Sequence, residues 1–193
     1  MRLWPGALVV LEGLDKAGKT TQRTALEAVD WESPKPLITH MPSGVFDLTK
    51  AIYETTERHR ISSGLAKQLL HLACHAENLP ALKAARRERG LVIDRWWWST
   101  VAYGWFGGLR SEISEDAFFG AIDMVWGDFA ADVVFLFLEA YEKDSHNVDT
   151  VTEGYEWLAS HNPDTVVEVP IGSPSSTTAF VMEELRRREL ITG

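Results

Sequence analysis

The feature that most constrains the fold of this chain is a glycine-rich segment that lies between an apolar run and a helical pattern. Residues 13–20 read Gly-Leu-Asp-Lys-Ala-Gly-Lys-Thr, shortly after the apolar run Ala7–Leu11. Glycines permit a tight turn whose backbone N–H groups bind phosphate oxygens, and the positive end of the next helix points at the same oxygens. Lys19 is expected to reach the β- and γ-phosphates of a nucleoside triphosphate, and the Thr20 hydroxyl is expected to bind Mg²⁺. The sequence therefore predicts a strand, a phosphate-binding loop and a helix, in that order.

Apolar runs and helical patterns alternate along the rest of the chain. Buried parallel strands read as continuous apolar runs, and the connections between them need helices. The alternation predicts an α/β fold of the P-loop NTPase type, with a five-stranded parallel sheet and helices on both faces. The expected strands are Ala7–Leu11, Leu37–Thr39, Leu91–Ile93, Val133–Leu138 and Val166–Val169. The expected helices are Lys19–Val29, Phe46–Arg58, Gly64–Arg89 with a kink or restart at Pro80, Trp97–Trp105, Glu115–Trp126, Asp149–Ser160, and Thr177–Glu189 capped by Ser175 or Ser176.

Length, charge and cysteine content limit the classes of protein that fit. A chain of 193 residues suits a single domain over residues 1–193. Its 28 acidic and 19 basic residues give a net charge of −9, which argues against a broad grip on duplex DNA. The single cysteine forms no intrachain disulfide, which suits the cytoplasm. No apolar stretch reaches the ~20 residues that span a membrane, so we expect a cytoplasmic protein without a membrane contact.

Asp94 and Arg95 form a second candidate site, because they directly follow the apolar run Leu91–Ile93. Ligands of open parallel sheets bind at the carboxyl ends of the strands. Asp94 would hold Mg²⁺ through water or accept a proton from an acceptor hydroxyl. Arg95 would bind an acceptor phosphate with two hydrogen bonds. A surface ion pair at the end of a strand is the alternative.

Three segments of the chain resemble thymidylate kinases. They are the phosphate-loop segment Leu11–Gln22, the segment Val92–Tyr103 around Asp-Arg, and the helical segment Leu69–Glu77. The resemblance covers most of the chain and implies a nucleoside monophosphate kinase fold that is usually a homodimer. It also implies transfer of the γ-phosphoryl group of ATP, with Mg²⁺, to a deoxynucleoside monophosphate.

The resemblance assigns roles to individual residues. Asp15 would contact the sugar 3′-hydroxyl of the acceptor or order the metal site, Arg95 would hold the acceptor phosphate, and Tyr103 would lie beside the acceptor. Thr20 and Asp94 would bind the metal, and the catalytic residues would be Lys16, Lys19, Asp94 and Arg95. The ATP-binding residues would be Gly13, Asp15, Lys16, Ala17, Gly18, Lys19, Thr20 and Thr21.

The short lid expected from the resemblance falls near residues 142–149 and contains no arginine. Some family members stabilise the transferred charge with lid arginines, and others use a basic residue in the phosphate loop. Lys16 occupies that loop position. It is therefore the predicted charge stabiliser, with Lys143 as a second candidate.

Three acceptor-side positions depart from the family pattern. His40 and His75 stand where the family has arginines that bind the acceptor phosphate and a thymine carbonyl, and His71 stands where it has an aromatic residue that stacks on thymine. Histidine stacks and forms one hydrogen bond, but it lacks the permanent charge and the fork of a guanidinium. We place all three in an acceptor site, although His71 and His75 alone also fit ordinary helix packing.

Three hypotheses about function follow. The first is a deoxynucleoside monophosphate kinase of the thymidylate kinase type. In the second the acceptor is a hydroxyl, on a nucleoside or on a 5-hydroxymethylpyrimidine in phage DNA, and Asp94 is a general base. In the third the protein binds ATP and transfers nothing. The aromatic residues Trp96–Trp98 would stack on a base or a strand of nucleic acid, or pack in the core and a dimer interface.

Overall fold

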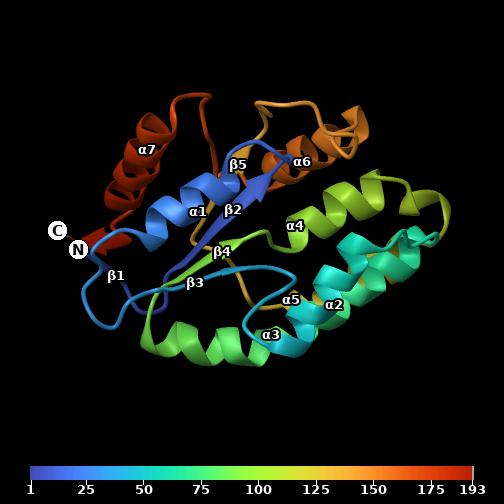
Figure 1. Cartoon of the computed structure of the whole chain (residues 1–193), viewed down its shortest axis with the longest axis horizontal. Coiled ribbons are helices and arrows are strands. Elements are labelled where there is room, and N and C mark those ends of the chain that lie inside the picture. Colours follow the sequence, from blue (N-terminus) through green and yellow to red (C-terminus); the bar gives the residue numbers. More distant parts are fainter. Residues whose placement is uncertain (193) are drawn as a thin grey trace.

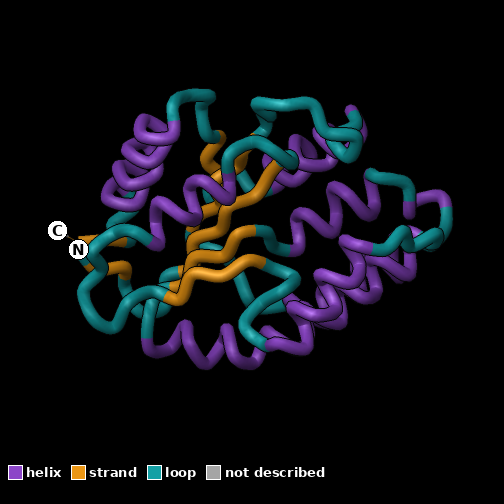
Figure 2. Tube along the Cα trace, viewed as in Figure 1, coloured by secondary structure: helices purple, strands orange, loops and turns teal. Residues whose placement is uncertain are grey.

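The computed structural model describes residues 1–192 and contains a five-stranded parallel sheet in the order β3-β4-β2-β5-β6. The α/β fold and the parallel sheet expected from the sequence are confirmed. The strands are β2 (Leu8–Gly13), β3 (Leu37–His40), β4 (Leu91–Asp94), β5 (Val133–Phe137) and β6 (Val166–Glu168). Figure 1 shows helices flanking the sheet, and Figure 2 shows that loops gather where the strands end.

The helices follow the strands as the crossovers of a parallel sheet require. Helix α1 packs against α7 on one side of the sheet, whereas α3 packs between α2 and α5 on the other (Figure 1). Their bounds are α1 Lys19–Glu27, α2 Asp47–Arg58, α3 Gly64–Glu88, α4 Trp97–Ser99, α5 Glu115–Trp126, α6 Asp149–His161 and α7 Pro174–Arg187, with the π-helix η1 Thr100–Phe106 and the 3-10 helix η2 Leu109–Ser111. Within residues 1–192, no helix is long and apolar enough to cross a membrane.

The structure corrects three details of the expected helices. The last helix begins at Pro174 with Ser173 as its N-cap, so the expected start at Thr177 is wrong. Pro80 lies inside a continuous α3 with its side chain exposed, so the helix does not restart there. The single helix expected over residues 97–105 is α4 followed by the wider π-helix η1, and residue spacing alone does not distinguish these hydrogen-bond periods.

A small antiparallel pair joins the two ends of the described chain. Strand β1 (Arg2–Leu3) pairs with β7 (Ile191–Thr192), so the N- and C-terminal segments lie side by side (Figure 1). Two-residue strands carry no usable alternation pattern, which explains why the sequence does not predict them.

The core lies around the central strands, which bury every residue of β2, β4 and β5. Trp98 and Trp126 are fully buried, and Trp96 is 6% exposed. Two of the three tryptophans in the cluster Trp96–Trp98 therefore pack in the core of this chain. Gly154 of α6 lies so close to η1 that a Cβ atom would stand 2.9 Å from the Phe106 ring, so a glycine is needed at this contact.

Candidate active site

The glycine-rich loop runs from the end of β2 to the start of α1, and Lys19 closes it. The Lys19 Nζ atom donates to the backbone oxygens of Gly13 at 2.9 Å and Leu14 at 2.5 Å. Gly18 lies at φ 97° as the N-cap of α1, a conformation that glycine adopts without strain. Burial, and then the charge of Arg95, lower the pKa of Lys19 to about 7. The loop therefore holds an ammonium group that is poorly solvated and ready to accept an anionic partner.

A cavity of about 550 Å³ lies over this loop. The residues from Asp15 to Thr21, which are the predicted ATP-binding residues except Gly13, all line it. Gly13 has a different task, because a Cβ atom there would stand 2.0 Å from the Phe137 backbone oxygen, and only glycine permits this approach of β2 to β5. His40 lines this cavity as well, beside Asp94 and Arg95.

A second cavity of about 450 Å³ adjoins the first. Predicted acceptor residues His71, His75 and Tyr103 line it, whereas His40 lines only the loop cavity. Both cavities share the same three lining residues, Asp15, Tyr53 and Arg95. These three residues therefore mark the junction at which a group bound over the loop meets a group bound in the second cavity.

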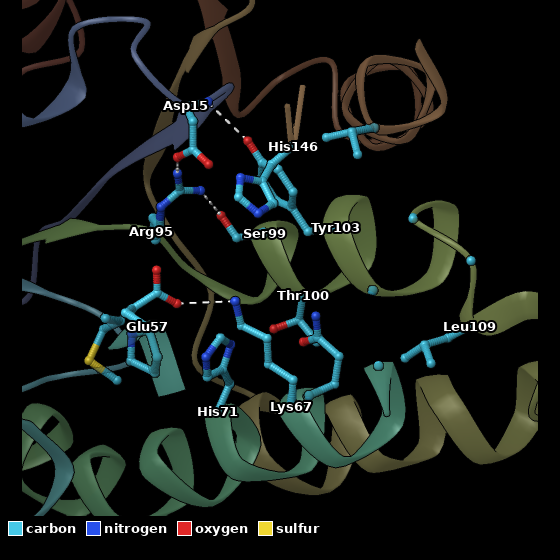
Figure 3. Close-up of a pocket in the computed structure, with 18 of the residues that line it drawn as sticks. Asp15, Glu57, Lys67, His71, Arg95, Ser99, Thr100, Tyr103, Leu109 and His146 are labelled. Carbon is cyan, nitrogen blue, oxygen red and sulfur yellow. Dashed lines mark hydrogen bonds and ion pairs between the residues drawn. The ribbon is translucent and has the colours of Figure 1, made fainter. Parts of the chain in front are cut away.

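Arg95 is fixed at this junction by contacts with three elements. Its guanidinium forms an ion pair with Asp15, donates to Ser99 Oγ at 2.8 Å, and lies 5.3 Å from the centre of the Tyr103 ring. Figure 3 shows Arg95 pointing between Asp15 and Ser99. Its backbone has a φ of 71°, which a non-glycine residue rarely adopts. The bend turns the chain between β4 and α4 at the site.

Glu12 forms hydrogen bonds with the residues that follow Arg95 in the chain. It is fully buried at the end of β2 and accepts hydrogen bonds from the Trp96 N–H at 2.6 Å, the Ser99 N–H at 3.0 Å and the Ser99 hydroxyl at 2.7 Å. Tyr155 of α6 donates to the same carboxylate at 3.0 Å. Burial raises the pKa of Glu12, whereas Arg95 and the hydrogen bonds from Ser99 and Trp96 oppose the rise. Glu12 thus ties β2, α4 and α6 together behind Arg95.

Asp94 is not part of a surface ion pair. Its side chain is 2% exposed, and its nearest cation is Arg23 of α1, with Nη1 3.3 Å from Oδ2. Burial raises the pKa of Asp94, and Lys19, Arg95 and Arg23 oppose that rise. Asp94 lines the loop cavity together with Thr20, so the two predicted metal ligands face the same space.

The three histidines are held as neutral side chains. Burial is the main cause, and it lowers the pKa of His40 to about 3, that of His71 to about 4 and that of His75 to about 3. Tyr53 joins two of them, with its ring 5.1 Å from the His40 ring and 6.1 Å from the His71 ring. None of the three therefore replaces the positive charge of an arginine.

The loop over residues 138–148, which contains most of the predicted lid, contacts the phosphate loop directly. Asn147 donates from Nδ2 to the backbone oxygen of Asp15 at 2.8 Å, and its Oδ1 atom accepts from the backbone N–H of Asp15 at 2.9 Å. Lys16 lies 3.5 Å from Glu142 and 3.9 Å from Asp144. The predicted charge stabiliser is therefore paired with the carboxylates of this loop.

Four residues of the site escape prediction from the sequence. Glu12 and Arg23 flank known motifs, but their partners are far away in the chain. Tyr53 and Asn147 reach the site only through the fold. The helical spacing of α2 gives Tyr53 an inward position, and no signal in the sequence singles out Asn147.

Comparisons with known proteins identify the family of this chain. A family model described as thymidylate kinase matches residues 11–142. A probable thymidylate kinase of Pyrococcus abyssi is 34% identical over 118 residues, which are 55% of this chain and 56% of that protein. The thymidylate kinase of Gluconobacter oxydans is 26% identical over 211 residues, with 97% of this chain and 98% of that protein covered. The chain spans about half the length of the first curated relatives that it matches.

Two solved structures share the fold. The thymidylate kinase of Ehrlichia chaffeensis superposes with a TM-score of 0.74 at 22% identity, covering 95% of this chain and 100% of that one. The thymidylate kinase of Candida albicans gives a TM-score of 0.70 at 20% identity, covering 98% and 96%. Because the family model matches more than half of the chain, this protein belongs to the thymidylate kinase family.

Proposed function

We propose that this protein is an ATP-dependent deoxynucleoside monophosphate kinase of the thymidylate kinase type. The observation that carries the proposal is the junction of the two cavities at Asp15, Tyr53 and Arg95. A triphosphate over the loop and an acceptor in the second cavity meet there. Membership of the thymidylate kinase family supports the choice of acceptor class.

The reaction needs positioning and neutralisation of charge more than covalent chemistry. The backbone N–H groups of the loop and the Lys19 ammonium bind the triphosphate. Arg95 orients the acceptor phosphate, one oxygen of which forms a bond to the γ-phosphorus as the bond to ADP breaks. When the triphosphate binds, the Lys16 side chain moves away from Glu142 and Asp144 and lies beside the transferred phosphoryl group.

The site also suits a magnesium ion. Thr20 and Asp94 offer hard oxygen donors within the loop cavity, and Mg²⁺ prefers such ligands. When bound with the triphosphate, the ion supplies positive charge that offsets the negative charge of the phosphates. The homodimer and the short lid near residues 142–149 stay predictions of the family resemblance.

The proposal is tested by measuring ADP release from MgATP with each deoxynucleoside monophosphate in turn. We expect release to depend on one or more of them. ADP release that depends only on a nucleoside, or label from ATP that enters hydroxymethylpyrimidine DNA, would instead establish the hydroxyl acceptor. Nucleotide binding without turnover on any acceptor would contradict every kinase assignment.

The binding of ATP is expected to take up a proton. Lys19 has a pKa near 7 in the free protein, and only its protonated form pairs with phosphate, so binding raises this pKa again. Affinity should be constant below pH 7 and fall by up to ~10-fold per pH unit above it. At pH 8, titration calorimetry in buffers of different ionisation enthalpy should show nearly one proton taken up per ATP. An uptake close to zero would contradict the buried, weakly basic Lys19.

Replacing Lys16 with methionine is expected to lower kcat about 100-fold, with a much smaller change in the KM for ATP, because the charge acts mainly in the transition state. The matched control is Lys143→Met, which removes a second lysine of the same region. Its side chain is exposed, and it should leave kcat within about threefold. A larger loss in the Lys143 variant would transfer the role to Lys143.

A further inference from the structure

One face of α3 lines the acceptor cavity. Gln68, His71 and His75 all line it, and their spacing of three and four residues places them on one side of the helix. Arg95 lies across the cavity from this helix (Figure 3), and the phosphate of an acceptor must reach the triphosphate near Arg95. In Figure 3, His71 rises from α3 below Arg95, and Lys67 lies beside it. The base of a nucleotide acceptor therefore extends toward this row.

His75 lines this cavity although it is almost completely buried. Its side chain is 3% exposed, its ring packs 5.0 Å from the Trp126 ring, and its Nδ1 atom has no hydrogen-bond partner within residues 1–192. The Oε1 atom of Gln68 is also buried without a partner in this part of the chain. Because no group in this part of the chain pairs with the Nδ1 atom of His75, no hydrogen bond to that atom fixes the tautomer of the ring.

The polar groups that α3 and Thr100 contribute to this cavity both donate and accept hydrogen bonds. A neutral imidazole carries one N–H and one bare nitrogen, the Gln68 amide carries both types, and the Thr100 hydroxyl that lines the same cavity carries both. The cations nearby are engaged elsewhere, because Lys67 pairs with Glu57 at 3.1 Å and Arg95 pairs with Asp15. Neither cation is therefore free to act as a fixed donor to the base, and the indole Nε1 atom of Trp96, another residue that lines this cavity, is buried.

We propose that the base subsite accepts pyrimidine deoxynucleotides that carry either a carbonyl or an amino group at the edge facing His75. This inference rests on the proposed kinase function. An arginine would donate to a carbonyl and repel an amino group, whereas a neutral histidine changes tautomer and the amide rotates to suit either group. Discrimination between the two kinds of base is therefore weak in this chain.

The pair dUMP and dCMP tests the inference, because the two nucleotides differ at this edge of the ring. We expect both to be phosphorylated with kcat/KM values within about tenfold of each other, whereas a site with a fixed donor would separate them by 100-fold or more. A ratio above 100-fold in either direction would overturn the inference and leave the proposed function intact. No turnover with any monophosphate would overturn both.

Three variants assign the effect to His75. His75→Leu should lower kcat/KM for dUMP and dCMP by a similar factor of about 10 to 100, because neither nucleotide keeps its partner. His75→Arg should favour dUMP by at least about 30-fold, and His75→Asn should keep the ratio near that of the wild type.

The exposed His59 provides the control, and His59→Leu should change neither value. Circular dichroism checks that each variant is folded, and His75→Leu carries the test if the larger arginine does not fit. Unchanged rates for folded His75→Leu on both nucleotides would show that His75 does not read the base.

Discussion

Replacing Lys19 with methionine is expected to lower kcat for phosphoryl transfer by at least about 1000-fold while the chain stays folded. The side chain is buried inside the phosphate loop, where its ammonium group donates to Gly13 and Leu14 in the free protein. When a triphosphate binds, the Lys19 ammonium group pairs with its phosphates. Methionine keeps the length and the apolar stem of lysine but lacks the positive charge. Steady-state ADP release, with circular dichroism as the check of folding, measures the effect.

Lys50→Met is the matched control for this experiment. Lys50 lies on α2, is exposed, and forms an ion pair with Asp47 at 3.5 Å, a pair of the kind that contributes little to stability. Its replacement should leave kcat and the unfolding temperature within error of the wild type. If Lys19→Met kept more than about a tenth of the wild-type rate, the loop would not be the phosphate site and the proposed function would fail with it.

The local order of elements around the phosphate loop follows from the sequence because it depends on neighbours in the chain. An apolar run, a glycine turn and a helix start are all encoded within residues 7–29. The placement of His71 and His75 in one cavity follows from helical spacing combined with the family resemblance. Asp94 is a harder case. The sequence places it at the end of a strand, but it does not reveal that Arg23 of α1 is its ion-pair partner.

Contacts between distant segments explain what the sequence does not reveal. Asn147 holds both backbone groups of Asp15 across 132 positions of the chain. Tyr53 reaches the junction of the two cavities because α2 packs against α3, and the Tyr53 ring lies 5.1 Å from the ring of His40 at the end of β3. The acidic lid can likewise be predicted only in part. The sequence shows that it contains no arginine, but it does not show that its carboxylates pair with Lys16.

Glu12 shows how the fold and the site depend on one buried group. Removing its carboxylate in Glu12→Ala leaves the N–H groups of Trp96 and Ser99 and the hydroxyls of Ser99 and Tyr155 without their acceptor. Losing one side of such a network costs about 3–5 kcal/mol of unfolding free energy, because the remaining groups stay buried. For a chain of this length the unfolding temperature should fall by ~6–20 °C, which scanning calorimetry measures.

The same substitution should also change the kinetics at temperatures where the variant is still folded. Ser99 loses its anchor and no longer fixes the Arg95 guanidinium, so the KM for the acceptor should rise about tenfold while the KM for ATP changes little. Glu153→Ala, which removes an exposed carboxylate from α6, is the control and should leave both constants and the unfolding temperature unchanged. Equal increases in the two KM values would mean that Glu12 supports the fold in general, whereas a selective increase for the acceptor would show that β2 and α6 position Arg95 through this carboxylate.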